Sequence, residues 1–136
     1  MIFIDRSIPK GVADALKCVR EDIIWLEDRF NHRAKEIEWM PVVGSSDWLA
    51  VLRDKKIRTR PLERQSIFRH GLGCFIFTQN NNPSRWDYFK LFAKTLDEME
   101  QRYADTAKPF IYLVDRDGRI RLDEAFAGMV RNGRIS

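Results

Sequence analysis

Short, almost wholly apolar runs recur along the chain and are separated by longer amphipathic segments. The runs are IFI (2–4), IIWL (23–26), WLAVL (48–52) and CFIFT (74–78). Each is too short for a buried helix and lacks the alternation of a strand with one solvated face. Such runs are typical of parallel strands that are covered by helices on both faces of a sheet.

The segments between these runs have apolar residues at helical spacing. They are PKGVADALKCV (9–19), AKEIEWMPVVG (34–44), PLERQSIFRHG (61–71) and a long helix that starts at the capping-box pair Ser84 and Asp87 and runs to about Ala107. In the second segment we expect Ile37 and Met40 to face the core, and Pro41 to shorten or kink the helix. The stripe predicted for the long helix is Trp86, Phe89, Phe92, Ala93, Leu96 and Met99.

The last recognisable pattern is a hairpin. FIYLV (110–114) and RIRL (119–122) flank DRDG (115–118), which contains an Asp-Gly turn. Strands that alternate with helices and end in a hairpin predict an α/β fold, with a mostly parallel sheet between two helical layers. The length fits a single domain over residues 1–136.

Composition adds a modest bias toward polyanion binding. The formal net charge is only +4, but arginine outnumbers lysine by 16 to 8, and its planar guanidinium suits phosphate. Cys18 and Cys74 lie far apart in apolar contexts, which predicts two buried free thiols rather than a zinc site or a disulfide framework. No apolar run is long enough for a signal peptide or a membrane span, so we expect a cytoplasmic protein.

Acidic residues stand where the predicted strands end. Asp5 closes the first strand, Asp28 follows the second and Asp54 follows the third. In parallel sheets the functional crevice lies beyond these carboxyl ends. Glu36 and Glu38 stand near the start of the next helix, and their spacing lets only one of them, predicted to be Glu36, line the crevice. Converging carboxylates favour Mg²⁺ or Mn²⁺; alternatively, each acid is a solvated residue or a cap.

A dense basic stretch follows Asp54. It contains Lys55, Lys56, Arg58 and Arg60 and ends at Pro61. Cations next to a metal site form a suitable track for the phosphates of a nucleic acid. The alternative is an ordinary solvated loop.

These pieces together resemble the PIN-like domains of VapC-type toxins, which are ribonucleases of toxin–antitoxin pairs. The matching pieces are FIDRSIP (3–9), EDRF (27–30), EIEW (36–39), WLAVLRDKKIRTRP (48–61) and PFIYLVDRDGRI (109–120). The resemblance implies a three-layer α/β/α domain that binds Mg²⁺ or Mn²⁺ at the carboxyl edge of its sheet and hydrolyses RNA. It implies a cognate antitoxin as partner, and the long helix offers surface for that antitoxin or for a homodimer.

The resemblance also assigns roles to single residues. Asp5, Glu36 and Asp54 take the positions of the catalytic metal ligands, and Asp28 supports the same metal site. The residues expected to hold RNA phosphates are Arg6, Lys55, Lys56, Arg58 and Arg60.

The sequence departs from the family pattern at the fourth strand. Many members carry a further aspartate there, whereas this chain has Thr78, Gln79, Asn80 and Asn81. A strict two-metal mechanism is therefore in doubt. One alternative is a PIN-like domain that binds nucleic acid with weak or no catalysis; the other is a protein-interaction module whose acids are only caps.

Overall fold

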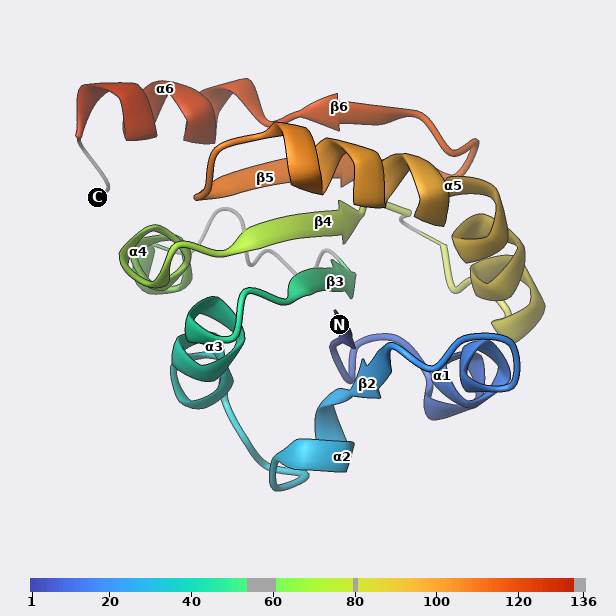
Figure 1. Cartoon of the computed structure of the whole chain (residues 1–136). Helices are drawn as coiled ribbons and strands as arrows, with labels where there is room; N and C mark the ends of the chain where they lie inside the picture. The colour runs from blue at the N-terminus through green and yellow to red at the C-terminus, as the bar shows by residue number, and fades with distance from the viewer. Residues whose placement is uncertain (54–60, 80, 134–136) are drawn as a thin grey trace.

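The computed structural model describes residues 1–53, 61–79 and 81–133 and has the predicted alternation of strands and helices (Figure 1). The strands are β1 Ile2–Ile4, β2 Ile23–Trp25, β3 Leu49–Arg53, β4 Gly73–Phe77, β5 Phe110–Val114 and β6 Ile120–Leu122. The helices are α1 Lys10–Lys17, α2 Leu26–Arg29, α3 Glu36–Ser45, α4 Pro61–His70, α5 Arg85–Asp105 and α6 Glu124–Asn132.

The described strands form one sheet in the order β2-β1-β3-β4-β5-β6. Neighbouring strands from β2 to β5 are parallel, and β6 pairs antiparallel with β5, so the mostly parallel sheet and the terminal hairpin are confirmed. The chain passes from β1 to β2 on one side and then returns to β3 on the other side. The carboxyl ends of β1 and β3 therefore flank the topological switch point, where open α/β sheets bind their ligands.

Helices cover both faces of the sheet and bury two separate cores (Figure 1). On one face, α1 and α5 pack their apolar residues on side chains such as Ile4 and Phe75. On the other face, α3, α4 and α6 pack on side chains such as Phe3 and Ile76. Alternate strand residues enter opposite cores, which explains why the strands are apolar throughout. The three-layer α/β/α prediction is confirmed.

The buried faces of two helices differ from the prediction. Ile37 is 63% exposed, because Trp39, Met40 and Val43 form the buried face of α3, and a residue two positions before Trp39 points away from it. Pro41 does not end α3, which continues to Ser45.

The stripe of α5 is also displaced around the helix. Phe92, Leu96 and Met99 are buried as predicted, but Trp86 is 64% exposed and Ala93 is exposed. The buried face of α5 begins at Tyr88 and also includes Leu91 and Thr95. The capping box of this helix is present: Ser84 Oγ accepts the N–H of Asp87, and an Asp87 carboxylate oxygen accepts the N–H of Ser84.

The two cysteines have different environments. Cys74 is buried in β4, as predicted, and burial raises the pKa of its thiol to about 12. Cys18 is exposed, because it follows the last turn of α1 rather than the buried face of that helix. Among the described residues no helix has both the length and the apolar character needed to cross a membrane.

Candidate active site

Asp5 lies at the switch point and is held there by backbone contacts with β3. Its N–H donates to the carbonyl of Val51, which extends the pairing of β1 with β3. Its carboxylate Oδ2 accepts the N–H of Ser7 at 3.0 Å, and Ser7 Oγ in turn accepts the N–H of Arg53 at 3.0 Å. The turn that carries Asp5 is thus bound to the last residue of β3. Within the described part of the chain, Asp5 Oδ1 has no hydrogen-bond partner.

Arg6 connects this turn to the segment that leads into α3. Its guanidinium donates to the carbonyls of His32 and Ala34, which lie shortly before Glu36. Two of the donors of Arg6 are therefore engaged with the backbone. Its observed role is to hold the start of α3 near the turn of Asp5, and its predicted contact with RNA remains a prediction.

Glu36 and Glu38 have different surroundings, as their spacing predicted. Glu38 is exposed and accepts the N–H of Lys35 at 3.3 Å, so it caps the start of α3. Glu36 is half-buried, and its carboxylate has no hydrogen bond or ion pair with any residue that the structure describes. Of the two acids, Glu36 is the one that is available to a ligand.

Asp28 is engaged in local contacts. Its Oδ2 pairs with Lys17 Nζ at 2.6 Å and accepts the N–H of Trp25 at 2.9 Å. Burial opposes ionisation of this carboxyl, but the contacts with Lys17 and Trp25 outweigh it and lower its pKa. Lys17 is the last residue of α1, at the end of that helix farther from Asp5. These contacts are those of a capping residue, and a metal-binding role for Asp28 remains a prediction.

Several predicted site residues lie outside the described residues. They are Asp54, Lys55, Lys56, Arg58, Arg60 and Asn80. Asp54 directly follows Arg53, the last residue of β3. Within residues 1–53, 61–79 and 81–133, no three histidine, cysteine or acidic side chains form a group that could hold a metal ion. Asp54, one of the three proposed ligands beside Asp5 and Glu36, lies outside these residues.

The edge beyond β4 and β5 contains residues that sequence analysis did not assign to a site. The hydroxyl of Thr78 donates to the carbonyl of Val114. Gln79 and Asn81, which come after Thr78, line a pocket of about 430 Å³. Asp115 directly follows β5, and its Oδ1 accepts the N–H groups of Asp117 and Arg119. Asp115 follows a strand as Asp5 does, so the same strand-end rule applies to it. From the sequence, only a turn was predicted there, because of the Asp-Gly pattern.

The available donor set fits a hard divalent cation. Asp5 keeps one carboxylate oxygen free, and Glu36 keeps its whole carboxylate free, within the described part of the chain. Carboxylate oxygens are the ligands that Mg²⁺ and Mn²⁺ prefer. Asp5 and Glu36 thus have free oxygen atoms of the kind that such an ion needs, and their binding of a metal, together with Asp54, remains a prediction.

The structure is thus a doubly wound α/β domain with Asp5 at its switch point. A family model described as "PIN like domain" matches residues 1–79, which is more than half of the chain, and the chain belongs to this family. The matched region contains β1 to β4 and all of the predicted acidic residues. No curated protein and no solved structure matches the chain. Membership makes nucleic acid the implied substrate class.

Proposed function

We propose that the protein is an endoribonuclease that depends on Mg²⁺ or Mn²⁺ and hydrolyses RNA phosphodiester bonds. The observation that supports it best is the position of Asp5, which follows β1 at the switch point and whose turn is bound to the residue preceding Asp54. A divalent ion, when bound, activates water and neutralises charge on the phosphodiester. Asp5, Glu36 and Asp54 are the catalytic residues in this proposal.

Other residues of the chain orient the carboxylates and bind the RNA phosphates. The Ser7 N–H fixes the orientation of the Asp5 carboxylate, so that one oxygen stays available. Arg6 positions the segment before Glu36 through the two backbone carbonyls. Lys55, Lys56, Arg58 and Arg60 hold the phosphates of the RNA beside Asp54, and Asp28 supports the site from α2.

We further propose that the protein is the toxin of a toxin–antitoxin pair and that residues 1–136 are one cytoplasmic PIN-like domain. The sheet continues beyond the family match into β5 and β6, which supports a single domain. An apolar groove of about 270 Å³ between α1 and α5, which includes the exposed Trp86, offers a surface for an antitoxin or a homodimer. Induced expression should stop cell growth, and coexpression of the product of the neighbouring gene should restore it. Normal growth with clear ribonuclease activity would instead indicate an RNA-processing enzyme.

The first prediction concerns the acids. Asp5→Asn and Asp54→Asn should each abolish Mg²⁺-dependent cleavage of RNA, because an amide loses the negative charge that holds the ion. Asp97→Asn on the exposed surface of α5 is the matched control and should cleave like wild type. Circular dichroism and thermal melting should show intact folds. Cleavage that survives both active-site changes would contradict the proposed function.

The alternative is a PIN-like domain that binds nucleic acid but is catalytically weak or inactive, or that acts only as a protein-interaction module. It is favoured by the neutral side chains of Thr78, Gln79 and Asn81 at the edge where a further acid is common. Calorimetric titration with Mn²⁺, combined with a cleavage assay, separates these functions. Metal binding without cleavage would support the alternative.

A further inference from the structure

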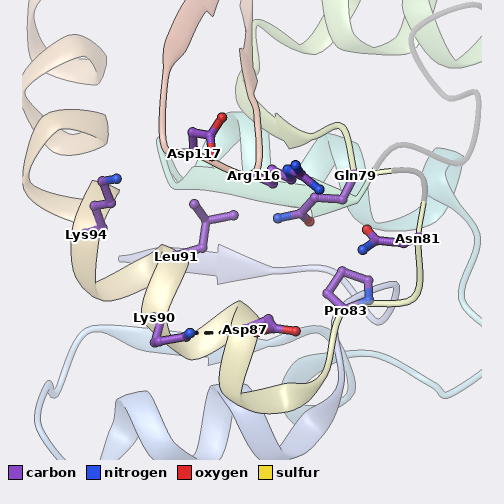
Figure 2. A pocket seen from close by; sticks show the side chains of 9 residues that line it. All are labelled: Gln79, Asn81, Pro83, Asp87, Lys90, Leu91, Lys94, Arg116 and Asp117. Carbon is purple, nitrogen blue, oxygen red and sulfur yellow. Dashed lines mark ion pairs between the residues drawn. The ribbon is translucent and has the colours of Figure 1, made fainter.

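A pocket with both polar and apolar lining lies beyond the carboxyl ends of β4 and β5, outside the set of acids discussed above. Its walls come from the segment after β4, the first turns of α5 and the turn between β5 and β6 (Figure 2). Its volume of about 430 Å³ lies in the range of small-ligand sites. Apart from Gln79, its lining residues lie beyond the region that matches the family model.

The charge available in this pocket is positive. Lys94 and Arg116 form no ion pair or hydrogen bond with any described residue, whereas Lys90 lies 3.8 Å from Asp87. Asp87 also caps α5 through the N–H of Ser84, and that contact is the main reason its pKa is lowered. Asp87 is thus already compensated, and Lys94 and Arg116 together exceed Asp117, the other acid in the wall, by one positive charge.

The side chain of Lys94 lies close to the hairpin. The turn places Gly118 at φ +87°, and a Cβ built there would lie 3.1 Å from Lys94 Cδ. The alkyl stem of Lys94 therefore passes directly over the turn that carries Arg116. Helix α5 and the hairpin together place both cations at one pocket.

The wall of the pocket also offers amide groups and apolar surface. Gln79 Oε1 is buried without a hydrogen-bond partner among the described residues, and such an oxygen gains from a ligand that brings a donor. The exposed Asn81 adds a second amide, and Leu91 and Pro83 provide the apolar surface (Figure 2). Donor and acceptor groups beside apolar surface suit an unpaired base.

The pocket is connected to the proposed active site. Arg53 Nη2 donates to the carbonyl of Asn81 at 2.9 Å, and Arg53 directly precedes Asp54. This hydrogen bond joins the last residue of β3 to the segment that lines the pocket.

We propose that the pocket binds one unpaired nucleotide of the RNA substrate, with its phosphate on Lys94 and Arg116 and its base against Gln79 and Asn81. This proposal rests on the proposed ribonuclease function and specifies single-stranded RNA as the substrate. A base within a duplex has its pairing edge occupied, so a duplex cannot place a base against the amides.

The second prediction tests the pocket by binding rather than by cleavage. The affinity for a fluorescein-labelled single-stranded RNA is measured by anisotropy in EDTA over a range of salt concentrations. The double variant Lys94→Ala with Arg116→Ala should bind about tenfold more weakly than wild type. The slope of log K against log salt should become shallower by about 0.7, because the contacts with one phosphate are lost.

The control variant also removes two positive charges, but at positions outside the pocket. Arg121 on β6 and Arg131 on α6 are exposed and lie outside the pocket, so Arg121→Ala with Arg131→Ala should retain most of the affinity. Equal losses in the two double variants would overturn the proposal. Gln79→Leu should weaken binding without changing the salt slope, and an unchanged affinity would refute the base contact.

Two further measurements separate the pocket from the proposed function. A blunt RNA duplex of the same length should show no difference between wild type and the pocket variant, and a tenfold difference would contradict a single-strand site. Failure of the proposed function would appear as cleavage by Asp5→Asn and Asp54→Asn, whereas failure of the pocket appears only in the metal-free binding assay.

Discussion

At the scale of single residues, Arg6 illustrates what a sequence pattern cannot reveal. As a cation beside Asp5, it was predicted to hold RNA. The structure shows its guanidinium bound to the carbonyls of His32 and Ala34, which are 26 and 28 residues away along the chain. No local pattern predicts such a long-range contact, because it depends on how the strands are ordered. Asp5 itself was predictable, since the strand-end rule requires only the sequence and the fold class.

The third prediction follows from this contact. Arg6→Gln should weaken Mn²⁺ binding by about tenfold, because the segment before Glu36 loses an anchor, and groups that orient metal ligands have effects of this size. Calorimetry measures the metal affinity, and anisotropy in EDTA measures the affinity for RNA without metal. A purely RNA-binding role would give the opposite result, with unchanged metal affinity and weaker metal-free RNA binding.

At the scale of elements, apolar runs were sufficient to locate the central strands, but not the faces of the helices. The strand positions were predicted correctly, because a short apolar segment is rarely stable anywhere other than in a buried strand. The faces of α3 and α5 were predicted only in part, because aromatic and aliphatic residues occur on more than one side of each helix. Helix α6 was not predicted, although Asp123 caps it through the N–H of Phe126 and Gly133 ends it at φ 64°.

The fourth prediction concerns the close approach of α3 and α4. A Cβ at Gly44 would lie 2.1 Å from the carbonyl oxygen of His70, so Gly44→Ala must displace backbone. We expect a loss of about 1–3 kcal/mol in the free energy of unfolding, measured by urea denaturation. Gly128→Ala is the matched control within α6, where the nearest atom is 3.8 Å away. It should stabilise the protein by about 0.5–1 kcal/mol. If Gly44→Ala also stabilised the protein, this result would contradict the close packing of α3 against α4.

At the scale of the whole molecule, the two edges of the sheet have different tasks. Asp5 and Glu36, with free carboxylate oxygens in the described part of the chain, lie toward the carboxyl edge, whereas a cluster of paired charges lies at the opposite edge. There Arg20 binds both carboxylate oxygens of Asp22 and also pairs with Glu100, so it connects the segment before β2 to α5. The bond from Arg20 is the main reason that the pKa of Asp22 is lowered.

The fifth prediction uses this cluster. Because the pKa of Asp22 is lower in the folded state, its stabilising effect is present above its ordinary pKa of 3.8 and disappears as the pH falls through the lowered value. Arg20→Gln should therefore cost about 0.5–1 kcal/mol at pH 7, a value reduced by the partial exposure of these groups. It should cost less at pH 3, where Asp22 gains a proton.

Urea denaturation of wild type and Arg20→Gln between pH 3 and pH 7, without metal, measures both effects. The difference between the two proteins should shrink steadily below about pH 4. Arg121→Gln, at an exposed position on β6, controls for the change in net charge and should show no such trend. A difference that stays constant with pH would mean that Arg20 stabilises the fold through the packing of its alkyl chain rather than through Asp22.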